Sequence, residues 1–227
     1  MDVDRVLTTG GVHLAYAVVG NANAAPMVLL HALGDRGADW AAVVPRLAEH
    51  FRVFTLDLRG HGESDWPGIY SFQLMCDDVI DVLDQLGLET VVLIGHSMGG
   101  VVAYLLAMQH PDRVGRLVVE DVSPPFKRDR PLPERPAGPL AFDWRVAPAI
   151  VAAVNAGDPD AWHGLDAITA PTLVVAGGAA SHIAQDKLEA AAARIRLCTM
   201  VTISAGHDVH AARPTEFTDV VLGWLRN

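Results

Sequence analysis

Six short apolar runs, most of them rich in β-branched residues, recur along the chain between longer segments of mixed polarity. The runs cover residues 28–30, 53–56, 91–94, 117–119, 173–175 and 200–203. Two intervening segments, 75–86 and 187–195, carry apolar residues three and four positions apart, which predicts amphipathic helices. Continuous apolar runs that alternate with helices are typical of parallel strands buried on both faces. The pattern therefore predicts an α/β fold, with helices on both faces of a mostly parallel sheet.

Two stretches depart from this alternation. Residues 13–19 alternate between apolar and polar positions, which predicts an antiparallel strand at one edge of the sheet. Six of the sixteen residues from Pro124 to Pro139 are prolines, which fix φ and remove backbone donors, so regular structure is not expected there. Residues 142–155 then predict a short helix. We expect residues 1–121 and 167–227 to form the core and residues 122–166 a short, proline-rich cap.

The composition fits one globular domain. The chain has 227 residues, of which 51% are hydrophobic and 19% are charged, and this excludes intrinsic disorder. A formal net charge of −10 argues against a nucleic-acid partner, because phosphate backbones bind clustered Lys and Arg. Only two cysteines, Cys76 and Cys198, and an N-terminus without a secretory pattern predict a cytoplasmic protein with reduced thiols.

An uncharged stretch over residues 90–109 is long enough to raise the question of a membrane span. Gly95-His96-Ser97-Met98-Gly99-Gly100 lies in its middle and predicts a buried strand, a turn and a buried helix instead, so we expect no membrane contact. A G-x-S-x-G motif in this context is typical of a serine nucleophile on a sharp strand-to-helix turn. The glycines let strand and helix approach closely, and the Met98 N–H at the helix start is placed to bind an oxyanion. The alternative is a tight glycine turn with a surface serine.

Four motifs, in this order, carry a family resemblance: His31-Ala-Leu-Gly34, the segment from Asp57 to Ser64 (DLRGHGES), the Ser97 turn, and Gly206-His207-Asp-Val-His210. With them the chain resembles the α/β-hydrolase superfamily over nearly its full length. The resemblance implies the fold and a hydrolytic activity without a cofactor. It says much less about the substrate, because this fold carries many chemistries.

His207 is the expected general base, because it follows the last predicted strand and a serine hydroxyl needs an imidazole to take its proton. A structural loop histidine is the alternative. His210 is expected to be a hydrogen-bonding residue that stabilises the loop. No third ligand stands at a suggestive spacing from this pair, so no metal site is predicted.

The resemblance places the second oxyanion donor at the Leu33 N–H. Relatives usually carry glycine where this chain has Ala32, which restricts φ and is expected to narrow the pocket without abolishing hydrolysis. In the segment from Asp57 to Ser64, Arg59 and His61 are expected to tie loops together near the site.

A serine hydrolase also needs an acidic residue that orients the catalytic histidine, the third member of its triad. Most relatives carry this acid in the turn after the strand at 173–175, but here Ala180, Ser181 and His182 stand in that turn. Asp121 ends an earlier strand, and the carboxyl ends of parallel strands face the same crevice as Ser97. A subset of small esterases, which the chain resembles, carries Asp-x-x-Pro at this position and an acid-free Gly-Gly-x-x-Ser later. We favour Asp121 over Glu120 and Asp186; Glu120 precedes it by one residue, so a strand points it to the opposite face.

Substrate contacts are expected around the predicted cap and the first loop, with Leu33 and Met98 beside the nucleophile. The candidates are His31, Phe126, Phe142, Trp144, Trp162 and His182. A mostly apolar wall suits an acyl chain or a hydrophobic alcohol, and a short cap predicts a partly open pocket. For each aromatic residue the alternative is packing of the cap onto the core.

These features predict a serine hydrolase, of the carboxylesterase type, that cleaves small to medium hydrophobic esters through an acyl-enzyme. Thioester, lactone or C–C bond hydrolysis would use the same residues, and cofactor-free perhydrolysis is a further option. Dehalogenation is disfavoured because it needs a carboxylate where Ser97 stands. The alternative of another class is a ligand receptor with the hydrolase fold. We expect a small-molecule ester as the only partner of a monomer or homodimer.

Overall fold

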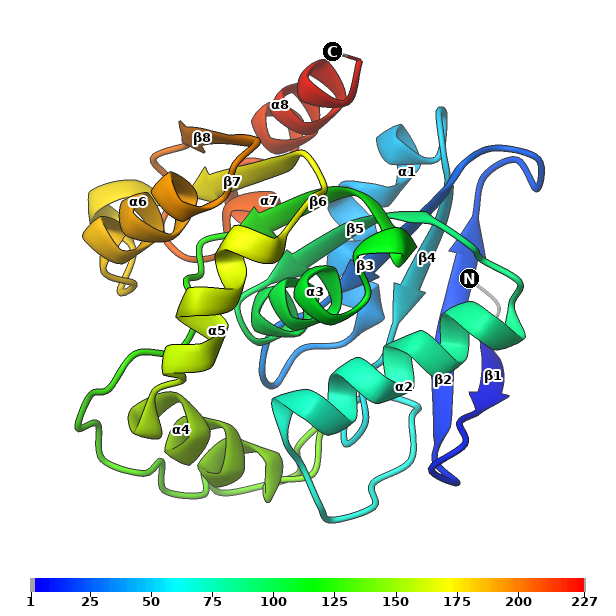
Figure 1. Ribbon diagram of the computed structural model, residues 1–227. Coiled ribbons are helices and arrows are strands. Elements are labelled where there is room, and N and C mark those ends of the chain that lie inside the picture. Colours follow the sequence, from blue (N-terminus) through cyan, green and yellow to red (C-terminus); the bar gives the residue numbers. More distant parts are fainter. Residues whose placement is uncertain (1–2, 227) are drawn as a thin grey trace.

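The computed structural model describes residues 3–226, and these residues contain one eight-stranded sheet (Figure 1). Its spatial order is β1-β2-β4-β3-β5-β6-β7-β8, and all pairings from β4 to β8 are parallel. The strands are β1 (Asp4–Leu7), β2 (His13–Val19), β3 (Pro26–Leu30), β4 (Arg52–Leu56), β5 (Val91–His96), β6 (Val114–Glu120), β7 (Thr172–Ala176) and β8 (Cys198–Thr202). The predicted α/β class and the six predicted apolar strands are confirmed.

The antiparallel side of the sheet differs in one respect from the prediction. Strand β2 pairs antiparallel with β4, as its alternating pattern indicates, but β1 pairs with its other side. Strand β1 is therefore the edge. It has four residues with a mostly exposed pattern, so it lacks the apolar signal from which the other strands were predicted.

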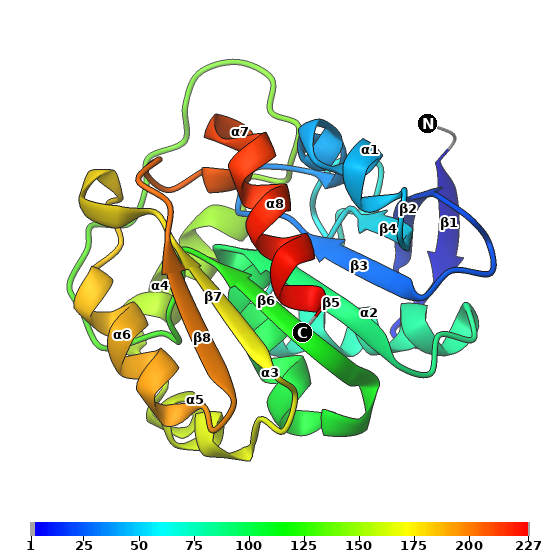
Figure 2. The same cartoon turned by 90° about the horizontal axis from the view of Figure 1, so that it is seen from above.

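Helices cover both faces of the sheet (Figure 2). The longer helices are α2 (Phe72–Gln85), α3 (Met98–Gln109), α4 (Val146–Ala156), α6 (Gln185–Arg194) and α8 (Pro214–Leu225), and the short ones are α1 (Val44–Leu47), α5 (Pro159–Gly164) and α7 (Val209–Ala212). Helices α2, α3 and α6 share one buried cluster with the sheet, and α1, α7 and α8 share a second cluster on the other face. These two clusters are the two layers that the apolar strands predict.

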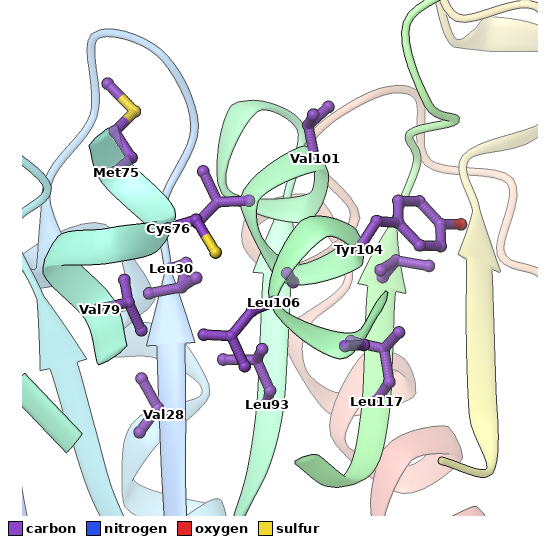
Figure 3. Packing of buried hydrophobic residues seen from close by; sticks show 14 of the residues in the cluster. Val28, Leu30, Met75, Cys76, Val79, Leu93, Val101, Tyr104, Leu106 and Leu117 are labelled. Atoms are coloured by element: carbon purple, nitrogen blue, oxygen red, sulfur yellow. The ribbon is translucent and has the colours of Figure 1, made fainter. Parts of the chain in front are cut away.

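Packing between α2, α3 and the sheet shows why the helices form there (Figure 3). The Ser71 Oγ caps α2 by accepting a hydrogen bond from the Leu74 N–H at 3.1 Å. Met75 and Val79, one helical turn apart, are buried in the same cluster as Val28 and Leu30 of β3. Helix α3 is buried on most of its circumference, which explains its uniformly apolar sequence.

The chain between β6 and β7 carries α4, α5 and a 3₁₀ turn at Leu165–Ala167. In the described chain, residues 121–141 form no helix or strand, as the prolines predict. Helix α4 begins at Val146, four residues later than the start of the predicted helix. No helix in the described residues is long and apolar enough to cross a membrane, and the uncharged stretch over 90–109 is divided between β5 and α3.

Candidate active site

Ser97 lies at the sharp turn between β5 and α3, with φ 50° and ψ −114°. Among the described non-glycine residues only Ser97 and Asp121 have positive φ, a conformation that is strained for an L-residue and often marks functional sites. A Cβ on Gly95 would collide with the Gly99 carbonyl, and one on Gly99 with the Leu30 carbonyl. The two glycines therefore let β5, α3 and the end of β3 meet at the serine.

The loop after β3 packs against the start of α3. The Gly99 N–H donates a hydrogen bond to the His31 carbonyl at 3.1 Å, and this bond fixes the loop beside Ser97. Leu33 and Met98 line the same cavity as Ser97. Within residues 3–226, neither the Leu33 N–H nor the Met98 N–H donates a hydrogen bond to another group. Both amides are therefore available to an oxygen atom bound near the serine.

His207 lies in the loop between β8 and α7, and its side chain is 15% exposed. Its Nδ1 donates a hydrogen bond to Asp121 Oδ2 at 2.8 Å, so the proton sits on Nδ1 and Nε2 is left as an acceptor. The His96 Nε2 donates to the His207 carbonyl at 3.0 Å, and His182 contacts the His207 ring edge-on. These contacts place the His207 ring next to His96, which precedes Ser97 in the chain, and next to His182, which lines the cavity at Ser97. In the described chain Ser97 and His207 are not hydrogen-bonded to each other, a common situation without substrate.

Asp121 follows β6 and is fully buried. Its carboxylate accepts hydrogen bonds from the Gly177 N–H at 2.8 Å, the Gln185 Nε2 at 3.2 Å and the Ser181 hydroxyl, besides that from His207. Burial raises the pKa of Asp121, but these hydrogen bonds outweigh it and hold the pKa below its ordinary value. The residue is therefore a fixed, ionised acceptor for His207.

Glu120 is the last residue of β6 and binds a different histidine from Asp121. Its carboxylate accepts hydrogen bonds from the His210 N–H at 2.8 Å and from the His210 Nδ1 at 2.9 Å. Trp40 stacks on the His210 ring at a centroid distance of 4.1 Å. Asp186, the third candidate acid, lies on α6 and forms an ion pair with Lys187. Asp121 is thus the candidate acid that contacts His207.

A cavity of about 140 Å³ opens at Ser97. Its lining comes from the loop after β3, from α2, α3 and α4, from the chain between β6 and α4, and from the turn after β7. The lining residues are Leu33, Phe72, Ser97, Met98, Val101, Val122, Ser123, Pro125, Arg128, Arg130, Ile150, Val151, Val154, Asn155, His182 and Ile183. The lining is apolar apart from a few uncharged polar groups and two arginines.

Of the six predicted substrate contacts, only His182 lines this cavity; the other five require correction. His31 is 1% exposed, because its Nε2 accepts from the Leu58 N–H and its Nδ1 donates to the Ala32 carbonyl. Phe142 stacks on His61, and Trp144 contacts Phe142.

Phe126 and Trp162 also lie outside the lining. Phe126 packs under the cationic ends of Arg128 and Lys187, and the Trp162 Nε1 donates to the Pro125 carbonyl at 2.9 Å. These two side chains, like Phe142 and Trp144, are engaged in contacts within the chain rather than directed into the cavity.

Two further expectations concern the loops and the metal. Arg59 binds Asp78 of α2 through two buried hydrogen bonds, so it ties its loop to a helix. His61 contacts His31 and Phe142, which lie in two other loops, as expected. Among the described residues, one group of side chains could supply ligands to a metal ion: His96, Glu120 and His210, without His207. One nitrogen or oxygen atom from each of the three lies within 4.8 Å of the others. The ion pair between Glu120 and His210 already uses most of these atoms. No spacing along the chain indicates this group, because its members lie on three separate segments.

Sequence reasoning did not identify the groups that hold Asp121. Gly177, Ser181 and Gln185 come from the turn after β7, where most relatives carry their acid. The Gly-Gly-x-x-Ser pattern was the available signal. Arg128 and Arg130 lie in the proline-rich stretch, which has no regular pattern that would place them, so their position in the cavity depends on how that stretch folds onto α4.

Comparison with known proteins places these features in a family. A family model described as alpha/beta hydrolase fold matches residues 25–142, which is more than half of the chain. A solved hydrolase from Pseudomonas aeruginosa PA01 superimposes with a TM-score of 0.87 at 29% identity, covering 100% of this chain and 99% of that one.

Three curated relatives carry names that describe enzymes. The mouse sn-1-specific diacylglycerol lipase ABHD11 is 27% identical over 91% of this chain and 82% of its own, and the zebrafish protein of that name is 37% identical over 53% and 39%. Mouse epoxide hydrolase 4 is 36% identical over 48% of this chain and 31% of its own. The chain therefore spans most of the mouse lipase but less than half of the other two.

Proposed function

The chain belongs to the α/β-hydrolase fold family and is a hydrolase, and we propose that it cleaves carboxylic esters with Ser97 as nucleophile, His207 as general base and Asp121 as the residue that orients His207. One observation carries the proposal. A serine in strained backbone geometry lines a mostly apolar cavity together with His182, and His182 contacts His207, which is bound through Nδ1 to the buried carboxylate of Asp121.

In the first half of the reaction, the Ser97 Oγ attacks the ester carbonyl carbon while its proton passes to Nε2 of His207. The bond between the carbonyl carbon and the alcohol oxygen then breaks, and the alcohol leaves with the proton from Nε2. Asp121 remains ionised throughout and stabilises the imidazolium between these steps. Its lowered pKa supports this role, because a protonated carboxyl could not accept the Nδ1 hydrogen bond.

The negative charge on the carbonyl oxygen is assigned to the N–H groups of Met98 and Leu33. Both residues line the cavity with Ser97, and both amides are without a partner among residues 3–226. The Met98 amide is also the first of α3, where the helix dipole favours an anion. In the second half of the reaction, water attacks the acyl carbon with His207 again taking the proton, and the acid and the Ser97 hydroxyl are released.

The substrate class follows from the size and lining of the cavity. A volume of about 140 Å³ is close to that of engineered apolar cavities of about 150 Å³ that bind benzene. We therefore expect the cavity to accept an acyl group of medium length. The mouse relative is named as a lipase, which is an ester hydrolase, and this supports an ester over the thioester, lactone and C–C alternatives that the same residues would serve.

Steady-state hydrolysis of p-nitrophenyl esters with two to eight acyl carbons tests the proposal. We expect repeated turnover by the unmodified protein and loss of nearly all of it in Ser97→Ala. The exposed carboxylate of Asp186 provides the matched control, so Asp186→Asn should keep full activity.

Two outcomes would remove the proposal. Full activity in Ser97→Ala would exclude the assigned nucleophile. No turnover on any ester, together with tight retention of the ligand, would favour a receptor with this fold.

A further inference from the structure

Two arginines line the cavity at Ser97 in an otherwise acidic protein. Arg128 and Arg130 belong to the lining, which contains no Asp or Glu. The chain as a whole has a formal net charge of −10. Positive groups are therefore concentrated at the candidate active site against the overall charge, an arrangement that raises the local concentration of anions.

Neither arginine has an anionic partner in the described chain. Arg59 and Arg145, which lie outside the cavity, each bind an aspartate directly. By contrast, no carboxylate of residues 3–226 lies within ion-pair distance of Arg128 or Arg130, and the buried Nε of Arg128 lacks a hydrogen-bond partner. Burial is the larger cause that lowers the pKa of Arg128, and the positive charge of Arg130 lowers it further. The two guanidinium groups therefore lie close enough to repel each other.

The backbone around these arginines is fixed rather than loose. The Arg128 N–H donates to the Asn155 carbonyl at 3.1 Å, and the Arg130 N–H donates to Asn155 Oδ1 at 3.3 Å. The Asn155 Nδ2 in turn donates to the Arg130 carbonyl at 2.7 Å. The Phe126 ring packs against the Arg128 guanidinium at 4.9 Å. One asparagine at the end of α4 thus clamps the segment that carries both cations.

We propose that Arg128 and Arg130 bind an anionic group, a carboxylate or a phosphate, at the end of the substrate's acyl chain. The inference rests on the proposed ester hydrolysis at Ser97. The same lining provides apolar contacts from α3 and α4 and two guanidinium groups, so it complements an apolar chain that ends in an anion. Guanidinium groups bind carboxylates and phosphates in two-pronged hydrogen bonds, which gives them selectivity for these groups over neutral ones.

The test compares esters that differ only in charge. The mono-p-nitrophenyl ester of adipic acid carries a free terminal carboxylate, and its methyl ester is the neutral counterpart. We expect kcat/KM to be at least tenfold higher for the charged ester. Arg128→Gln and Arg130→Gln should each reduce that preference by about tenfold.

Arg135→Gln is the matched control, because Arg135 lies in the same proline-rich stretch but outside the lining. Its charge preference should equal that of the unmodified protein. The p-nitrophenyl ester of 6-phosphonohexanoic acid distinguishes a site for phosphate from a site for carboxylate. A phosphate site should give a higher kcat/KM for this ester than for the charged adipate ester, and a carboxylate site should not. Addition of NaCl should reduce the preference because salt screens partly exposed charges.

Binding to Ser97→Ala separates this inference from the proposed function. Calorimetric titration with the charged and neutral adipate esters measures affinity without turnover. We expect about tenfold tighter binding of the charged ester, and loss of that difference when Arg128→Gln is added. Equal affinities, or a difference unchanged by Arg128→Gln and Arg130→Gln, overturn the inference. Absence of turnover by the unmodified protein, with charge-selective binding retained, overturns only the ester chemistry.

Discussion

Two neighbouring carboxylates at the end of β6 each bind a histidine from the segment after β8, Asp121 one in the loop and Glu120 one in α7, and their surroundings give the two pairs different tasks. Asp121 holds His207, whose side chain is 15% exposed and whose Nε2 is left as an acceptor. Glu120 holds His210, whose side chain is 5% exposed, and binds both its ring and its backbone N–H. The same pair of chemical groups is therefore suited to proton transfer in one place and to fastening the loop in the other.

Electrostatics sharpen the difference. Burial lowers the pKa of His210, but the hydrogen bond and charge of Glu120 outweigh it and raise the pKa above its ordinary value. Burial raises the pKa of Glu120, and the neighbouring His96 and His210 lower it by more. The two groups thus form a buried ion pair. Because His207 and His210 are three residues apart, this pair fixes the loop that presents the candidate base.

The largest expected effect is on catalysis through Asp121. Asp121→Asn keeps the shape of the side chain but removes the charge that stabilises the imidazolium and fixes the Nδ1 proton. We expect kcat for a p-nitrophenyl ester to fall by about 10⁴-fold, the size of the loss found when the acid of a serine triad is replaced by its amide. Glu120→Gln should lower kcat by less than tenfold. Comparable losses in both variants would contradict the division of labour.

The next effect is on stability through Glu120. Removal of one partner from a buried ion pair costs about 3–5 kcal/mol, because the other charge is left buried without compensation. We expect a loss of this size for Glu120→Gln in urea unfolding followed by circular dichroism. The double variant Glu120→Gln/His210→Gln should recover part of it. A fall in kcat of several hundredfold with unchanged stability would instead assign Glu120 to the chemistry.

Neutral buried histidines give the opposite pH dependence from that of His210. Burial lowers the pKa of His31 to about 4 and that of His61 to about 3. The unfolded chain takes up a proton on each near pH 6.5, so the unfolded state binds more protons below this pH and stability falls on acidification until the folded-state pKa is reached. At pH 5 each of these two histidines lowers the free energy of unfolding by about 2 kcal/mol relative to neutral pH.

Urea unfolding at pH 7.5 and pH 5 measures this difference. His61→Gln should reduce the loss between the two pH values, whereas His163→Gln, at an exposed position, should leave it unchanged. An identical pH dependence in His61→Gln and the unmodified protein would exclude His61 as a source. The contribution of His210 has the other sign, since its raised pKa gives stability that is present below pH 6.5 and lost as the pH rises through the folded-state pKa.

The smallest effect concerns the support of Asp121. The Ser181 hydroxyl provides one of several hydrogen bonds to its carboxylate. Ser181→Ala removes a hydrogen bond whose net contribution is about 1 kcal/mol, and we expect kcat to fall by roughly fivefold to tenfold because Asp121 is then held less firmly. Ser204→Ala, in the loop before His207, is the control and should have no effect. A loss near that of Asp121→Asn would show that Ser181 acts in the chemistry itself.

The sequence predicted those parts of the site that depend on local backbone geometry. Gly95 and Gly99 around Ser97 specify a strand-to-helix turn by themselves, and the preference for Asp121 over Glu120 agrees with the hydrogen bond between His207 and Asp121. The positions of six strands along the chain also followed from the apolar runs, because a buried parallel strand leaves a continuous signal.

The parts that were not predicted depend on contacts between distant segments. His31 has the same sequence context as a pocket residue, but the Leu58 N–H binds its ring and turns it inward. The aromatic residues of the cap were expected in the cavity, yet hydrogen bonds and stacking within the chain hold them elsewhere. Loop side chains have no periodic pattern that fixes their direction, so the sequence alone does not predict how residues 122–145 fold.

The most direct test of the central claim is mass spectrometry after reaction with diethyl p-nitrophenyl phosphate. In this reaction the Ser97 Oγ would displace p-nitrophenolate and become diethylphosphorylated, which stops turnover at the covalent stage. We predict one adduct per chain, on the peptide that contains Ser97, formed much more slowly in Asp121→Asn and at an unchanged rate in Asp186→Asn. An adduct on another residue, or continued ester hydrolysis by a protein fully modified at Ser97, would contradict the assignment.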